Sequence, residues 1–240
     1  MHAHRPSRLN RRRALAGVGV LGIQRWLPAC GSEGRSTLTP GALAGDDASC
    51  LLTPTQTEGP FFFDTGLERR DIRDGQQGAL LELALRVVDA ESCEPISGAL
   101  VEVWHADAAG VYSAFDTSQG NSGNATGQAF LRGFQASDSA GLVEFLTVYP
   151  GWYPGRTPHI HIMVLLASAG QREGPLLTTQ LYFPETITDA VYALDPYAAR
   201  GPRSTTNATD GVGVPAELVS PVDATERGFS TSFRLVAPGA

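Results

Sequence analysis

The sequence contains no lysine, few histidines and no long apolar run. All 18 of its basic residues are arginine, which we interpret as a bias of composition without functional meaning. Seven of these arginines precede Ser36, a stretch that contains one acidic residue, Glu33, so the rest of the chain is strongly acidic. An acidic surface repels nucleic acid and anionic membranes. The charge pattern therefore argues against nucleic acid as a partner.

The absence of a long apolar run also excludes a membrane-spanning helix. The N-terminus instead resembles an export signal, because Asn10–Leu15 is similar to a twin-arginine motif and a short apolar run from Ala14 to Ile23 follows it. Leu27–Cys30 is similar to a bacterial lipoprotein cleavage box. Acylation of Cys30 would then be the sole membrane attachment. A basic tail without a targeting role is the alternative.

The sequence has only three cysteines, and predicted export bears on whether they form a disulfide. When Cys30 is set aside, the pair Cys50 and Cys93 remains. An even pair in an oxidising compartment favours a disulfide, and two buried free thiols are the alternative. We expect an exported protein that is periplasmic, extracellular or lipid-anchored at the outer face of the cytoplasmic membrane. Its predicted parts are an export signal (1–35), a flexible tether rich in small residues (36–49) and one folded domain (50–240).

Short alternating segments dominate the folded part. Glycine (27) and proline (16) are frequent, which predicts many turns and few long helices. Several short strands separated by turns are typical of an all-β sandwich or barrel. The role of the irregular stretch Asp195–Pro221 stays open. The predicted strands are Gly78–Asp89, Ala99–Trp104, Gly141–Val148, Leu176–Phe183 and Gly228–Val236, together with the second half of Tyr149–Val164.

The scarcity of histidine makes its placement informative. Of five histidines, two lie in the N-terminal segment, and His159 and His161 are two residues apart in a predicted strand. Side chains of a strand alternate between its faces, so these two imidazoles share one face and can form a pair of metal ligands. Two polar residues on a solvated face are the alternative. A Gly/Pro-rich turn precedes the strand and is expected to bring Tyr153 and Arg156 close to the histidines.

Four segments in order resemble the intradiol ring-cleavage dioxygenases, the family of protocatechuate and catechol dioxygenases. The resemblance covers roughly Cys50 to Phe183. The four segments are Thr57–Phe61 (TEGPF), Trp104–Ser113 (WHADAAGVYS), Pro150–His161 (PGWYPGRTPHIH) and Thr179–Phe183 (TQLYF).

The resemblance implies a β-sandwich with long connecting loops and one non-haem ferric ion, Fe(3+). The implied metal ligands are Tyr112, Tyr153, His159 and His161. Anionic phenolates favour Fe(III) over Fe(II), so the iron acts as a Lewis acid. His105 matches the family without being a ligand there. Tyr149 is the competing candidate, but the alignment of the Pro-Gly-Trp-Tyr motif places Tyr153 on the metal.

The same resemblance implies the reaction and its other residues. O2 is inserted between the two hydroxyl-bearing carbons of a catechol, which gives a cis,cis-muconate-type product. Tyr153 is expected to accept a catechol proton, Arg156 to stabilise charge on the ring, and Gln180 to support Arg156. The pocket-lining residues are expected to be Thr57, Gly59 and Phe61. The sequence leaves the identity of the catechol and the oligomeric state open.

Two other functions compete with this one. An Fe(II) cupin or extradiol oxygenase also uses His-x-His, but it needs a carboxylate or a third histidine at the metal. A non-catalytic sandwich would bind aromatic compounds or carbohydrate with Trp104, Trp152 and the run Phe61–Phe63, which we expect to be buried.

Overall fold

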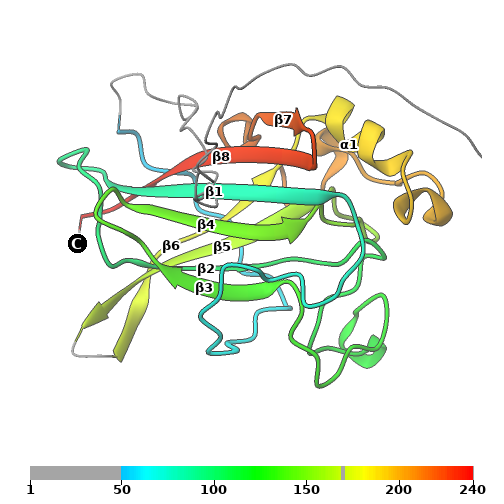
Figure 1. The fold of residues 1–240 in the computed structure, drawn as a ribbon, viewed down its shortest axis with the longest axis horizontal. Coiled ribbons are helices and arrows are strands. Elements are labelled where there is room, and N and C mark those ends of the chain that lie inside the picture. The colour runs from blue at the N-terminus through cyan, green and yellow to red at the C-terminus, as the bar shows by residue number, and fades with distance from the viewer. Residues whose placement is uncertain (1–49, 169–170, 240) are drawn as a thin grey trace, which may run out of the picture. The chain divides into compact units, whose positions relative to one another are not determined.

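Two four-stranded sheets packed face to face carry the fold (Figure 1). The computed structural model describes residues 50–168 and 171–239, so the predicted export signal and tether, with Cys30, lie outside the described residues. The first sheet has the order β4 (Leu142–Val148), β1 (Leu80–Asp89), β8 (Gly228–Ala237), β7 (Val222–Thr225). The second sheet has the order β3 (Arg132–Ala136), β2 (Leu100–Trp104), β5 (His159–Ser168), β6 (Gln171–Tyr182).

All neighbouring strands are antiparallel except β1 and β8, which run parallel in the middle of the first sheet. The core lies between the sheets, where alternate side chains of each strand meet. Leu81, Leu83 and Leu85 of β1 are buried there, together with Ile160 and Ile162 of β5. Burying one such side chain stabilises the fold by about 1.5–3 kcal/mol relative to leaving it exposed. The prediction of an all-β sandwich is confirmed.

The structure contains elements that the sequence pattern did not predict. These are β3, β7 and a short helix, α1 (Glu185–Tyr192). β3 shows no clear apolar alternation and β7 has only four residues. Each pairs with a neighbouring strand, β3 with β2 and β7 with β8. The stretch Asp195–Pro221, predicted to be irregular, contains three 3-10 turns, at Tyr197–Arg200, Asn207–Thr209 and Ala216–Leu218. Within the described part of the chain, no helix has the length and apolarity needed to cross a membrane.

A disulfide joins Cys50 to Cys93, whose Cα atoms lie 5.7 Å apart. Cys93 lies in the turn after β1, so the bond ties the start of the described chain to the first sheet. The chain that follows Cys50 then crosses to the second sheet. Thr53 N donates to Val236 O at 3.0 Å, and Gln56 N donates to Thr178 O at 2.9 Å. This crossing segment leads directly to Thr57.

Replacing both Cys50 and Cys93 with serine is expected to lower the free energy of unfolding by about 2–4 kcal/mol, because the bond closes a loop and restricts the unfolded chain. The two residues are 43 positions apart. Urea unfolding followed by circular dichroism measures the change. Wild-type protein unfolded with a reductant present should match the variant. Equal midpoints for oxidised wild type and variant would contradict the prediction.

Candidate metal centre

His159 and His161 lie on the outer face of the second sheet, because Ile160 and Ile162 between and beyond them take the inner face. Each histidine has a partner on the neighbouring strand β6. His159 is opposite Tyr182, and His161 is opposite Gln180. The period of two along β5 thus places both imidazoles at one point on the sheet surface, as their spacing predicted.

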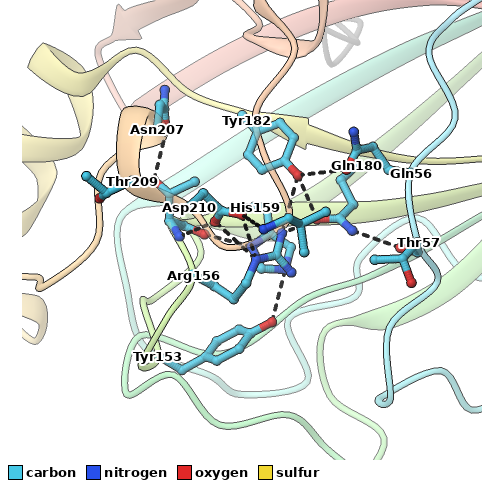
Figure 2. Close-up of polar contacts among 12 residues, drawn as sticks. Gln56, Thr57, Tyr153, Arg156, His159, Gln180, Tyr182, Asn207, Thr209 and Asp210 are labelled. Carbon is cyan, nitrogen blue, oxygen red and sulfur yellow. Dashed lines mark hydrogen bonds and ion pairs between the residues drawn. The ribbon is translucent and has the colours of Figure 1, made fainter.

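Two tyrosines from separate loops approach the same point. His159 Nε2 lies 3.3 Å from the phenol oxygen of Tyr112 and 3.2 Å from that of Tyr153. It also lies 3.1 Å from Nε2 of His161. A fourth neighbour, the Nη1 atom of Arg156, is 3.4 Å away, and Figure 2 shows Tyr153 and Arg156 facing His159. The structure therefore brings together all four residues that the resemblance named as metal ligands.

Hydrogen bonding alone does not explain this crowding. The Nδ1–H group of His159 donates to the carbonyl of Thr157 at 2.7 Å, which leaves a single lone pair on Nε2. One lone pair cannot satisfy the surrounding phenol, imidazole and guanidinium groups together. Bonds of about 2.1 Å from a shared cation would account for donor atoms spaced this closely. Two phenol oxygens and two imidazole nitrogens are also a donor set that suits ferric iron, so the residues present fit the metal.

Burial keeps all four groups neutral in the protein alone. Burial, reinforced by Arg156, lowers the pKa of His159 to about 3. Burial, together with the neighbouring His159, holds the pKa of His161 well below its usual value. Burial also raises the pKa of both Tyr112 and Tyr153. Neutral imidazoles are ready to bind a metal, whereas the phenols need a nearby cation before they ionise.

Tyr112 is held rigidly in the long loop after β2. Its side chain is only 1% exposed, and its ring stacks on Phe61 with centroids 4.6 Å apart. Asn121 fixes the backbone from both sides, accepting from Tyr112 N at 2.9 Å and donating to Tyr112 O at 2.7 Å. The guanidinium carbon of the buried Arg132 lies 5.9 Å from the centre of the Tyr112 ring. The sequence did not single out Asn121 or Arg132.

Tyr153 is less constrained and lies on a tight turn. Arg156 N donates to Tyr153 O at 3.2 Å, and Gly155 has a φ of +84°, which a residue with a side chain rarely adopts. This turn brings Tyr153 and Arg156 back beside His159. The prediction that it needs no distant part of the chain is wrong, because Gly211 N donates to Gly155 O at 3.3 Å and Asp210 binds the side chain of Arg156. Tyr153 remains partly accessible, unlike Tyr112.

The predicted pocket segment lies against this cluster. A side chain at Gly59 would place its Cβ 3.3 Å from His161 Cε1, so the backbone approaches the imidazole closely. The carbonyl of Thr57 accepts from Gln180 Nε2 at 2.8 Å. Phe61 is buried and packs on Tyr112, whereas Phe63 is 50% exposed. The expectation that the whole phenylalanine run is buried is therefore wrong, because Phe63 extends beyond the aromatic cluster.

Arg156 is surrounded by the polar partners His159, Gln180, Tyr182 and Asp210, all labelled in Figure 2. Its Nη2 atom donates to Gln180 Oε1 and, at 3.3 Å, to the hydroxyl of Tyr182. Its Nε atom lies 3.0 Å from both carboxylate oxygens of Asp210. Burial alone would lower the pKa of Arg156, but Tyr153 and Asp210 outweigh it and raise that pKa. The role predicted for Gln180 matches its contact, while Asp210 and Tyr182 were missed.

The other candidates in the sequence have structural contacts. Tyr149 is fully buried in the core between the sheets, and its hydroxyl lies 2.7 Å from Thr188 Oγ1. His105 is also buried, with Nδ1 2.8 Å from the carbonyl of Ala106 and Nε2 2.7 Å from Thr147 Oγ1. Asp107 accepts from backbone groups of its own turn. These hydrogen bonds connect none of the three residues to Tyr112, Tyr153, His159 or His161.

Across residues 50–168 and 171–239, no three residues of the types His, Cys, Asp and Glu come together as a metal site. An Fe(II) centre of the cupin or extradiol type needs two histidines with a carboxylate, or three histidines. The described residues therefore give no support to that competing function.

Comparison with known proteins agrees with this donor set. A family model described as Dioxygenase matches residues 57–203, which is more than half of the chain. A solved structure of an intradiol ring-cleavage dioxygenase from Tetranychus urticae superposes with a TM-score of 0.70 at 29% identity. This alignment covers 79% of this chain and 95% of that one. The chain belongs to the intradiol ring-cleavage dioxygenase family.

Two further relatives share different lengths of sequence with this chain. The beta chain of protocatechuate 3,4-dioxygenase from Burkholderia cepacia is 34% identical over 142 residues, which cover 55% of this chain and 56% of that protein. The dioxygenase domain of a carbohydrate-binding fusion protein from Streptomyces sp. SirexAA-E is 32% identical, with a TM-score of 0.57. That alignment covers 79% of this chain and 99% of the domain. The chain spans about half the length of the curated relatives it matches.

The ligand assignment predicts opposite results at two neighbouring tyrosines. Tyr153→Phe should weaken the visible tyrosinate-to-iron absorption of the iron-loaded protein, because it removes a donor oxygen next to His159. Tyr149→Phe should leave that absorption unchanged and cost about 1 kcal/mol of stability, because it removes one buried hydrogen bond to Thr188. Absorption spectra and thermal unfolding of both variants provide the measurement. Loss of the band in the Tyr149 variant alone would show that the assignment is wrong.

Proposed function

We propose that this dioxygenase inserts both atoms of O2 between the hydroxyl-bearing carbons of a catechol, giving a cis,cis-muconate-type product. The observation that carries the proposal is the convergence of two phenols and two imidazoles on one buried point. Membership of the intradiol family supports the same chemistry. Tyr112, Tyr153, His159 and His161 would hold the iron. When bound, a ferric ion would supply a Lewis acid to which both oxygens of a catecholate can coordinate.

Tyr153 is the residue suited to take a proton from the catechol. Its phenol oxygen lies beside His159, yet its side chain is partly accessible to solvent. Tyr153 also belongs to a turn between Gly151 and Gly155. A phenolate at this position can move aside and accept the proton at its own oxygen. Tyr112 cannot exchange places in this way, because it is buried, stacked on Phe61 and fixed by Asn121.

Arg156 supplies the fixed positive charge of the site. Its Nη1 atom lies 3.4 Å from His159 Nε2, while Nε is bound to Asp210 and Nη2 to Gln180. A guanidinium held in place stabilises negative charge that develops on the ring of a bound catecholate without first having to reorganise. The buried rings of Phe61 and Trp104 limit water around the same point, which strengthens this electrostatic effect.

The test of this proposal is oxygen uptake by iron-loaded protein with a panel of catechols, combined with mass analysis of the product. We expect one O2 consumed for each ring opened. Tyr153→Phe should reduce turnover by about 10²–10⁴-fold, the usual effect of losing an acid–base group. A protein that holds iron and binds catechols but consumes no O2 would overturn the proposal in favour of a non-catalytic aromatic-binding sandwich.

The cellular location is a separate proposal: the protein acts after export. The twin-arginine-like motif and the disulfide between Cys50 and Cys93 support this, because disulfides persist mainly in oxidising compartments. Changing both Arg11 and Arg12 to lysine should retain the protein in the cytoplasm of a bacterial host, as measured by cell fractionation. Cys30→Ser should release exported protein from the membrane fraction if Cys30 is acylated. Unchanged export of the double-lysine variant would contradict the proposal.

A further inference from the structure

Asp210 reaches the candidate site from a part of the chain outside the family match, which ends at residue 203. It follows the 3-10 turn Asn207–Thr209, and its side chain is 0% exposed. A fully buried carboxylate is costly unless its oxygens are paired. The hydrogen-bond partners of this carboxylate therefore indicate its role.

Three groups donate to the Asp210 carboxylate. The Nε atom of Arg156 lies 3.0 Å from each of its oxygens. The backbone N–H of Thr157 donates to Oδ2 at 2.7 Å, and the backbone N–H of Val212 donates to Oδ1 at 2.9 Å. Asp210 thus binds both the side chain of Arg156 and the backbone of Thr157, which follows the turn that carries Tyr153.

The partners of the other two guanidinium nitrogens, Nη1 and Nη2, show how the side chain of Arg156 is oriented. Nη2 is bound to Gln180 and Tyr182, and Gln180 is itself held by the carbonyl of Thr57. Only Nη1 is left, and it is directed at His159 (Figure 2). Because a guanidinium is planar, fixing Nε and Nη2 also fixes the direction of Nη1.

We propose that Asp210 is a positioning residue for Arg156: it holds the guanidinium so that Nη1 faces the catechol ring. This inference rests on the proposed function. The carboxylate also compensates the buried charge of Arg156, so the cation can lie beside the metal ligands at an acceptable cost. Asp210 itself does not touch the reacting atoms.

A purely structural role is the competing explanation, and Asn207 provides a matched control. Asn207 fastens the same loop, accepting from Thr157 Oγ1 at 2.8 Å and donating to Phe183 O at 2.9 Å, without contacting Arg156. Asn207→Ala should therefore loosen the loop while leaving Arg156 paired. Asp210→Asn removes the charge that holds Arg156 and keeps an acceptor oxygen for one of the two backbone N–H groups that bond the carboxylate.

The experiment measures kcat, KM, iron content and thermal stability of iron-loaded Asp210→Asn, Asn207→Ala, Arg156→Met and the double variant Asp210→Asn with Arg156→Met. We expect Asp210→Asn to lower kcat for catechol about 10- to 100-fold, the effect of a misplaced catalytic group, with catechol affinity weakened less than kcat and iron content unchanged. Asn207→Ala should lower stability without this loss of kcat. The double variant should be no slower than Arg156→Met alone.

Two results would overturn the positioning role. One is a double variant whose losses multiply, which would mean that Asp210 acts independently of Arg156. The other is an equal loss of kcat in Asn207→Ala, which would mean that the loop alone matters. If iron-loaded wild type does not open catechol, the proposed function fails instead. The same cycle is then measured as the dissociation constant for catechol by optical titration, and multiplying losses there overturn the positioning role.

Discussion

The alternation of side chains along β5 is the constraint on which the site depends. A strand whose Ile160 and Ile162 enter the core must present His159 and His161 together on its other face. The backbone then sets where both imidazole side chains begin, and the hydrogen bond from His159 Nδ1 to the carbonyl of Thr157 orients one of the rings. This rigidity matters because a metal centre tolerates little error in the placement of its ligands. The hydrophobic core between the sheets therefore also defines the position of the candidate metal site.

The loops complete the site with different degrees of freedom. Tyr112 is locked by stacking and by Asn121, whereas Tyr153 stands on a glycine-containing turn and is partly accessible. Tyr112 is thus held in place and Tyr153 has more freedom to move, although both phenol oxygens lie about equally far from His159 Nε2. In the proposed reaction, this difference in burial and backbone support suits Tyr112 to a fixed ligand role and Tyr153 to proton transfer.

The sequence predicted local features well and remote pairings poorly. The histidine pair, the turn that returns Tyr153 and Arg156, and the longer strands all follow from period and turn chemistry within a few residues. Tyr112 needed the family resemblance, because nothing local connects it to β5. No sequence pattern pointed to a role for Asp210, because it lies in an irregular stretch 54 positions from its partner Arg156. The strands β3 and β7 were missed for a similar reason: their neighbours in the sheet, and not their own residues, hold them extended.

The parallel pairing of β1 with β8 has a consequence for how the protein is made. In the first sheet, β8 lies between β1 and β7, so the earliest strand along the described chain pairs with the last one. A ribosome releases β1 long before β8, and until then one edge of β1 and part of its apolar face have no partner. The first sheet is therefore completed only after residues 228–237 have emerged, and contacts between such distant segments form slowly. Until that moment the chain carries an open strand edge, the kind of surface on which newly made proteins aggregate or recruit chaperones.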